Sequence, residues 1–113
     1  MNKNELKNIA ENLLDVFNHA GKESIDIFNK GLKIEIKKDK SPVTNGDLRV
    51  NELLTKKILE LTPNIPIISE ETVNIDVKNK EKIFWLIDPI DGTYDYINNL
   101  DEFTINAGLI IDK

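Results

Sequence analysis

The chain has 113 residues, of which 40% are hydrophobic and 31% are charged, a mixture typical of one soluble globular domain. Its net charge of −5 excludes a basic field that would attract nucleic acid or an anionic membrane surface, although bound cations can still attract a small phosphate ester. The absence of cysteine excludes a disulfide framework, a thiolate metal site and a thiol nucleophile. No apolar segment approaches the ~20 residues of a membrane span, and the N-terminus does not resemble a signal peptide. The cytosol is the favoured compartment, with a peripheral position at the inner face of the membrane left open, and we expect no stable membrane insertion.

A long amphipathic helix is predicted at the N-terminus, with Asn2 and Glu5 as a capping pair and Gly31 as its end. Apolar or small residues recur in it every three or four positions, which predicts a single buried stripe. The stripe consists of Leu6, Ile9, Ala10, Leu13, Phe17, Ala20, Gly21, Ser24 and Phe28.

A strand with one solvated face is predicted over residues 32–37, because apolar and charged residues alternate there. Residues 38–42 are predicted to form a polar loop. Thr44 is then a suitable N-cap for a second amphipathic helix, which ends where Thr62 and Pro63 interrupt the helical spacing.

The remaining sequence predicts three strands and a short helix. Residues 65–68 form a strand that ends at Ser69-Glu70-Glu71, and the polar residues 72–82 form a surface connection. Residues 83–87 are apolar without alternation, which predicts a strand buried on both faces. A short helix is predicted over residues 94–99 and a last strand over residues 103–111.

The expected fold class is α+β, with a mainly antiparallel sheet and two long helices on one face. The last strand has no evident partner before the sequence ends at Lys113. We therefore expect the natural protein to continue beyond this residue.

The segment that follows the apolar strand carries two carboxylates, Asp88 and Asp91, three residues apart. Burying a carboxylate without a partner costs several kcal/mol, about 3 or more, so a cation is the best reason for both acids to be there. Pro89 restricts the turn between them, and Gly92 allows a ligand to reach the backbone. If Thr93 opens a short helix, its free N–H groups favour a phosphate next to the cation.

Two more acids, Glu70 and Glu71, end the preceding predicted strand. Carboxylate oxygens from separate strands are the ligands that Mg²⁺ prefers, and the lack of cysteine and of a suitable histidine cluster disfavours Zn²⁺. Two such ions about 4 Å apart activate a water and stabilise a leaving alkoxide. Glu71 is more simply a solvated acid, because neighbours on a strand face opposite sides.

Asp47 has two interpretations that do not exclude each other. It lies three residues after Thr44, the spacing of a capping box. It can also bond the Thr93 hydroxyl, so that the two residues orient and deprotonate an attacking water. Two other candidates have simpler explanations: His19 is treated as structural, and the lysines near residue 38 as a solvated loop that can also meet a phosphate.

These motifs together resemble the inositol monophosphatase superfamily of magnesium-dependent, lithium-sensitive phosphatases. The resemblance spans nearly the whole chain. It rests on Asp47, then Ile68-Ser69-Glu70-Glu71, then Trp85-Leu86-Ile87-Asp88-Pro89-Ile90-Asp91-Gly92-Thr93, in that order and spacing. Within the superfamily, further segments are most similar to the CysQ-type 3′(2′),5′-bisphosphate nucleotidases: Ser41-Pro42-Val43-Thr44, Leu61-Thr62-Pro63-Asn64-Ile65-Pro66 and Glu102-Phe103-Thr104-Ile105-Asn106.

The resemblance implies a metal site for two or three Mg²⁺ ions. Glu70 and Asp88 would bind metal, with Asp88 bridging two ions. The Ile90 carbonyl would be a ligand of the first ion, and Asp91 would serve the second. The implied fold is the N-terminal half of the sugar-phosphatase-like layered sandwich.

The resemblance also implies the catalytic roles. Asp47 and Thr93 would handle the nucleophilic water, together with Glu70. The phosphate would be held by the backbone N–H groups of Gly92 and Thr93, and the substrate-binding set would also include Glu70, Ile90 and Asp91.

The implied substrate is a small phosphate ester, most simply the 3′-phosphate of adenosine 3′,5′-bisphosphate, a by-product of sulfate assimilation. An inositol monophosphate or fructose bisphosphate is the alternative. CysQ-type enzymes usually have Lys and an acid after Gly-Thr, whereas this chain has Tyr94 and Asp95. Asp95 favours the CysQ branch over the inositol monophosphatases. The family's frequent homodimer is left open.

In the family, a further Asp ligand and most contacts to the substrate base come from a C-terminal half. We therefore expect the second metal site of this 113-residue chain to be incomplete, with weak Mg²⁺ binding and little or no turnover. A hypothesis of another class follows, in which the chain is a non-catalytic metal- or nucleotide-binding domain, or a truncated remnant that needs a partner chain.

Two rival motifs fit poorly. In haloacid-dehalogenase phosphatases one residue separates the two acids, whereas Pro89 and Ile90 separate them here. An EF-hand loop would place Ile90 and Gly92 at two of its ligand positions, and a buried strand would not precede it.

Overall fold

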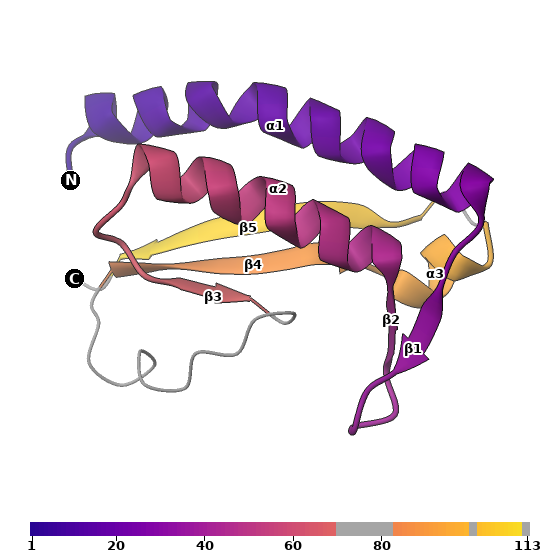
Figure 1. Cartoon of the computed structure of the whole chain (residues 1–113). Coiled ribbons are helices and arrows are strands. Elements are labelled where there is room, and N and C mark those ends of the chain that lie inside the picture. The colour runs from indigo at the N-terminus through magenta and orange to yellow at the C-terminus, as the bar shows by residue number, and fades with distance from the viewer. Residues whose placement is uncertain (70–82, 100–101, 112–113) are drawn as a thin grey trace.

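The computed structural model describes residues 1–69, 83–99 and 102–111. Glu70, Glu71, the predicted connection over 72–82 and the last two residues lie outside this description. The described elements are α1 (Lys3–Lys30), β1 (Ile34–Ile36), β2 (Pro42–Thr44), α2 (Asn45–Leu61), β3 (Ile67–Ser69), β4 (Ile83–Asp91), α3 (Thr93–Ile97) and β5 (Thr104–Ile111). Figure 1 shows their arrangement.

Helix α1 begins and ends where its sequence signals predict. The Asn2 side chain accepts a hydrogen bond from the Glu5 backbone N–H at 2.8 Å, and its amide donates to the Glu5 carboxylate at 3.0 Å. Gly31 ends the helix with a φ of 110°, and its N–H donates to the carbonyls of Ile27 and Phe28. The predicted capping pair, helix end and amphipathic character are confirmed.

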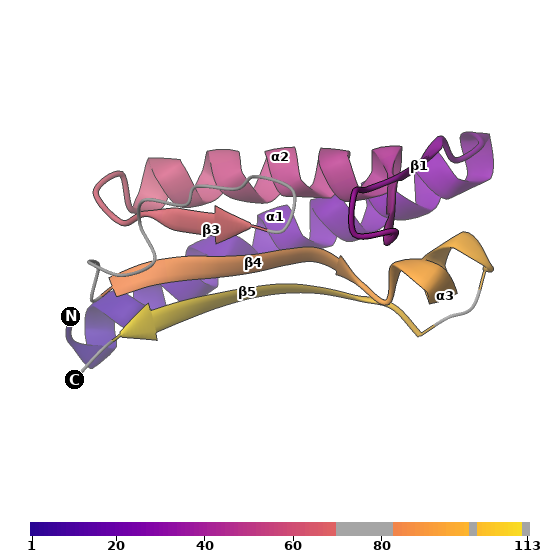
Figure 2. The same ribbon diagram turned by 90° about the horizontal axis from the view of Figure 1, so that it is seen from below.

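The main sheet has the order β3-β4-β5, with β3 parallel and β5 antiparallel to β4. Both long helices lie on the same face of this sheet, and α2 packs beside α1 and against β4 (Figures 1 and 2). The predicted architecture of two long helices on one face of a sheet is confirmed. The buried core between the layers includes Val50, Leu54 and Ile58 of α2 and Trp85 and Ile87 of β4.

Trp85 links the end of α2 to the middle of the sheet. Its indole N–H donates a hydrogen bond of 3.0 Å to the hydroxyl of Thr62, the residue that caps α2. Its backbone N–H donates to the Pro66 carbonyl at 2.8 Å. The indole ring thus packs in the core while its N–H group is hydrogen-bonded, which explains why a buried tryptophan is accommodated here.

The prediction that β4 is buried on both faces is wrong. Trp85 and Ile87 are buried, whereas Leu86 between them is 50% exposed. The reason is that the two helices cover one face of the sheet, and no other described element covers the opposite face. The apolar run over residues 83–87 therefore alternates in burial although it does not alternate in polarity.

Residues 32–44 also differ from the prediction. Strand β1 is present, but its three residues are all exposed, and it pairs with β2 in a separate antiparallel hairpin. The predicted loop is limited to a turn in which the Lys37 N–H donates to the Ser41 carbonyl at 2.9 Å. Strand β2 is missed because its three residues lead directly into the N-cap of α2, which dominates the local pattern.

Replacing Leu54 by Ala tests the core. Leu54 is fully buried, so Leu54→Ala is expected to lower the free energy of unfolding by about 3 kcal/mol. Leu59→Ala is the matched control, because Leu59 lies on the same helix and is 51% exposed. The control is expected to change the stability by less than about 0.5 kcal/mol in urea denaturation. Equal losses in the two variants would contradict the described core.

Candidate active site

The site begins with an irregularity in the pairing of β4 with β5. Asp88 pairs with Asn106 and Asp91 with Thr104, so three steps along β4 match two steps along β5. One strand therefore carries an extra residue, as in a β-bulge. Pro89 lies within this stretch, where the interrupted ladder tolerates a residue that has no N–H to donate.

This bulge determines where the two acids lie. Directly paired residues of neighbouring strands share a face, and so do residues two apart on one strand. Because their partners Thr104 and Asn106 are two residues apart, Asp88 and Asp91 lie on one face, the face opposite the helices. On a regular strand, residues three apart would lie on opposite faces.

Gly92 follows the acids and has a backbone conformation that other residues rarely adopt. Its φ is +87°, and it caps the short helix α3. A Cβ atom at this position would lie 3.1 Å from the Glu102 carbonyl oxygen. Glycine is therefore required both by the left-handed backbone and by the close approach of the chain before β5.

The turn of α3 directs Thr93 back toward the start of α2. The Thr93 hydroxyl lies 3.1 Å from Oδ1 of Asp47 and 3.1 Å from the Ile90 carbonyl oxygen. A hydroxyl has one proton, so these two oxygens share it. This contact joins residues 46 positions apart in the sequence and links Asp47 to the backbone between Asp88 and Asp91.

Both proposed geometries of Asp47 are present. Its Oδ2 accepts hydrogen bonds from the backbone N–H of Thr44 at 2.8 Å and from the Thr44 hydroxyl at 2.5 Å, while its own N–H donates to that hydroxyl at 3.2 Å. Its Oδ1 faces Thr93. The capping box is therefore confirmed, and it holds the carboxylate, which is 1% exposed, with one oxygen directed at the Thr93 hydroxyl.

The described residues supply part of a donor set for a hard cation. Asp88 is partly buried near the end of β4. Carboxylate and carbonyl oxygens at Asp88, Asp91 and Ile90 are of the kind that Mg²⁺ takes, so the residues present fit this ion. Within the described ranges no three carboxylate or histidine side chains converge, and Glu70, the fourth candidate, lies outside them.

The other candidates lie elsewhere. His19 lies 3.5 Å from the Glu23 carboxylate on the surface of α1 and is 56% exposed. Lys38 and Lys40 are exposed on the turn between β1 and β2. Asp39 lies between them, and hydrogen bonds from Ser41 lower the pKa of its carboxyl group.

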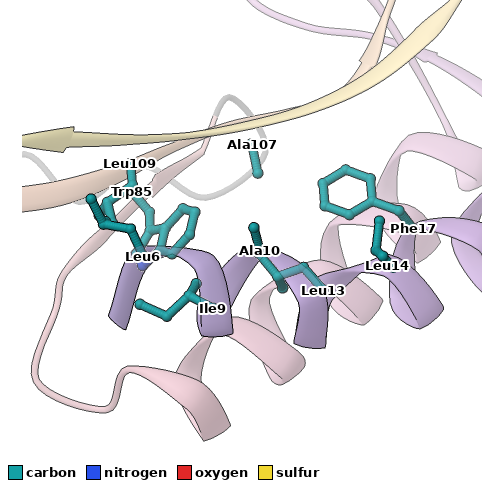
Figure 3. A pocket seen from close by; sticks show the side chains of 9 residues that line it. All are labelled: Leu6, Ile9, Ala10, Leu13, Leu14, Phe17, Trp85, Ala107 and Leu109. Atoms are coloured by element: carbon teal, nitrogen blue, oxygen red, sulfur yellow. The ribbon is translucent and has the colours of Figure 1, made fainter. Parts of the chain in front are cut away.

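An apolar cavity of about 320 Å³ lies between α1 and the sheet, away from the acids (Figure 3). It has no polar or charged side chain to bind a phosphate, apart from the indole N–H of Trp85, which is bonded to Thr62. Its lining residues are Leu6, Ile9, Ala10, Leu13, Leu14, Phe17, Trp85, Ala107 and Leu109. The cavity is therefore not a phosphate site.

None of the described helices combines the length and apolar character that crossing a membrane requires.

Sequence reasoning missed Tyr96 and Gly46. The Tyr96 side chain is 2% exposed, and its hydroxyl donates to the Ser24 backbone carbonyl at 2.5 Å. Burial raises the pKa of this hydroxyl to about 12, and the negative charge of Asp47 adds to the shift. One feature of the sequence could have indicated a close contact here. Gly46, a residue unfavourable in a helix, lies directly before Asp47 in the first turn of α2.

Comparison with known proteins defines the class. The sequence profile of the inositol monophosphatase family matches residues 4–113. The 3′(2′),5′-bisphosphate nucleotidase CysQ of Haemophilus influenzae is 36% identical over 106 residues, which are 92% of this chain and 39% of that protein. An IMPase of Thermotoga maritima has a TM-score of 0.74 at 24% identity, covering 87% of this chain and 37% of that one. An IMPase/NADP phosphatase complexed with Mg²⁺ and phosphate has a TM-score of 0.72 at 21% identity, covering 93% of this chain and 38% of that one.

The layered arrangement of two helices on a mixed sheet therefore matches the N-terminal part of the IMPase fold. The chain belongs to the inositol monophosphatase family. It spans about two fifths of the length of the relatives cited here.

Replacing Gly92 by Ala tests the turn that positions Thr93. The positive φ and the Glu102 carbonyl at 3.1 Å both oppose a side chain, so Gly92→Ala is expected to destabilise the fold by about 1–3 kcal/mol. Gly108→Ala on β5 is the control, because a Cβ there meets nothing nearer than 3.9 Å. Thermal unfolding that shows the same change for both variants would contradict the requirement for glycine.

The two functions of Asp47 can be separated by a pair of variants. Thr44→Ala removes the N-cap hydroxyl and is expected to cost about 1–2 kcal/mol. Asp47→Asn keeps an oxygen toward the Thr44 donors, and its amide can donate to the Thr93 hydroxyl, which then donates to Ile90. We expect it to cost less than about 1 kcal/mol. Urea denaturation measures both, and a larger loss in Asp47→Asn than in Thr44→Ala would contradict this account.

Proposed function

We propose that this chain is the metal- and phosphate-binding domain, residues 1–113, of a Mg²⁺-dependent phosphatase that hydrolyses phosphate monoesters. The proposal is carried by the hydrogen bond between the Thr93 hydroxyl and Asp47 Oδ1, directly beside the acids that end β4. A hydroxyl held by a buried carboxylate is suited to take a proton from water. The adjacent carboxylates suit a divalent cation that neutralises a phosphate group.

In this proposal Asp88 and Asp91, the Ile90 carbonyl and Glu70 hold the metal. When bound, Mg²⁺ supplies positive charge that lowers the pKa of a water and stabilises the leaving oxygen. The Ile90 carbonyl already accepts from Thr93 and has a second lone pair for a cation. Substrate contacts are assigned to Glu70, Ile90 and Asp91 and to the backbone N–H groups of Gly92 and Thr93.

The proton of the attacking water has a short route in this arrangement. Water donates to the Thr93 oxygen while the Thr93 hydroxyl donates its own proton to Asp47 Oδ1, 3.1 Å away. The water oxygen forms a bond to phosphorus, and the ester P–O bond breaks with its electron pair on the leaving oxygen. Oδ2 of Asp47 stays bonded to Thr44 throughout, so the capping box keeps Oδ1 oriented.

The proposed substrate is adenosine 3′,5′-bisphosphate, from which the 3′-phosphate is removed. It is supported by the 36% identity to a CysQ nucleotidase and by Asp95 after the Gly-Thr pair. Inositol monophosphate is the runner-up, because solved structures of the same fold include an IMPase.

The first test measures phosphate release from adenosine 3′,5′-bisphosphate and from inositol 1-phosphate, with and without Mg²⁺. Because the second metal site of this chain is expected to be incomplete, we expect slow release, which requires Mg²⁺, prefers the nucleotide and is abolished in Asp88→Asn, the variant that loses a charged ligand. Leu59→Ala, exposed on α2, is the control and is expected to keep full activity. Preference for inositol 1-phosphate would replace the proposed substrate by the runner-up.

A second candidate function is metal binding without turnover. It is favoured by the coverage of only 39% of the CysQ relative, because residues outside this stretch can contribute to catalysis in the relatives. Titration calorimetry with Mg²⁺ separates the two. Mg²⁺ binding that Asp88→Asn abolishes, without phosphate release from either ester, would establish this candidate and overturn catalysis by the chain as given.

A further inference from the structure

Tyr96 joins α3 to the distant helix α1 and to Phe103, just before β5. From α3 its hydroxyl donates to the Ser24 carbonyl in α1. Its ring packs edge-on against Phe28 of α1, with centroids 5.9 Å apart, and against Phe103, with centroids 4.8 Å apart. The side chain is therefore held at its tip by a hydrogen bond and along its ring by two aromatic contacts.

The tip of Tyr96 lies against the backbone of Gly46. A Cβ atom built at Gly46 would lie 2.4 Å from the Tyr96 hydroxyl oxygen, 2.8 Å from Cε2 and 2.9 Å from Cζ. Distances this short do not occur between non-bonded atoms, so any other residue at position 46 would displace the ring. Gly46 lies in the first turn of α2 with an ordinary negative φ, where a glycine is otherwise unfavourable. The close approach of the Tyr96 side chain thus explains why residue 46 is a glycine.

Gly46 and Tyr96 lie close in the sequence to Asp47 and Thr93, the residues of the proposed proton transfer. Asp47 directly follows Gly46, and Thr93 lies three residues before Tyr96, on the five-residue helix α3. Because the Tyr96 ring is held by Ser24, Phe28 and Phe103, we expect its displacement from Gly46 to move α3 relative to the first turn of α2. The Thr93 to Asp47 distance of 3.1 Å leaves little room for such movement, because a hydrogen bond weakens steeply beyond about 3.5 Å.

We propose that Tyr96 is a positioning residue, and that its close fit against Gly46 holds α3 so that the Thr93 hydroxyl stays within hydrogen-bonding distance of Asp47. The catalytic part of this inference rests on the proposed function. The geometric part does not, because the distance between Thr93 and Asp47 can be followed without turnover. Burial and the charge of Asp47 raise the pKa of Tyr96 to about 12, so its hydroxyl keeps its proton as a donor to Ser24 at neutral pH.

A double-mutant cycle tests the fit. Gly46→Ala is expected to displace Tyr96 and to lower kcat at least tenfold, because the Thr93 hydroxyl is then moved away from Asp47. Gly46→Ala combined with Tyr96→Phe is expected to recover part of the loss, because the phenyl ring lacks the atom in closest conflict and is no longer tied to Ser24. Gly21→Ala is the matched control in α1, where an added Cβ meets nothing within 4 Å, and it is expected to leave kcat unchanged.

A second measurement is independent of turnover. The NMR signals of the Thr93 methyl group and the Asp47 amide are expected to shift in Gly46→Ala, to return toward the wild-type positions in the double variant and to be unaffected in Gly21→Ala. Unchanged Thr93 and Asp47 signals in a folded Gly46→Ala variant would overturn the proposal. An equal loss in the single and double variants would also overturn it, because the glycine would then be needed for its backbone alone.

Failure of the proposed function has a different signature. A wild-type chain without phosphate release would contradict catalysis, while the NMR arm would still support or overturn the positioning role of Tyr96.

Discussion

Pro89 cannot donate a backbone hydrogen bond, and it lies within β4 where the ladder to β5 is interrupted. The interruption is a bulge that adds one residue to β4 between two paired positions. Asp88 and Asp91, three positions apart, thereby lie on one face of the sheet, away from the helices, while Ile90 turns into the core. The left-handed Gly92 and the turn of α3 come next in the chain, so this irregularity lies at the centre of the site and positions its two acids.

The second half of the site depends on a helix cap. A capping box ordinarily stabilises only the start of a helix, and Asp47 uses one carboxylate oxygen for that purpose. The same contacts bury the carboxylate and orient its other oxygen toward Thr93. In the proposed function, stability and chemistry would therefore be supplied by different atoms of one side chain, and a substitution that preserves one oxygen acceptor would separate them.

The helices were well predicted because their signals are local. Asn2, Glu5 and Gly31 mark the ends of α1, and Thr44 with Asp47 marks the start of α2, through contacts within a few residues. Burial was predicted less well. The apolar run around Leu86 indicates a strand but not which faces are covered, since coverage depends on elements packed from elsewhere in the chain. The hairpin of β1 and β2 is more exposed than the sequence predicts for the same reason: its short strands pair with each other instead of joining the main sheet.

By itself the sequence determined the helices, the strands other than β2 and the chemical types gathered around residues 88–93, because spacing, capping and residue type are local properties. It could not determine that Asp88 and Asp91 share a face, since that follows from the register with β5. The bond between Thr93 and Asp47 was one of two interpretations that the sequence allowed, and the sequence could not show that both hold together. Nor could it determine that Tyr96 fills the space left by Gly46. Those contacts join residues 46 or more positions apart or depend on fractions of an ångström between packed elements, and only the tertiary structure decides them.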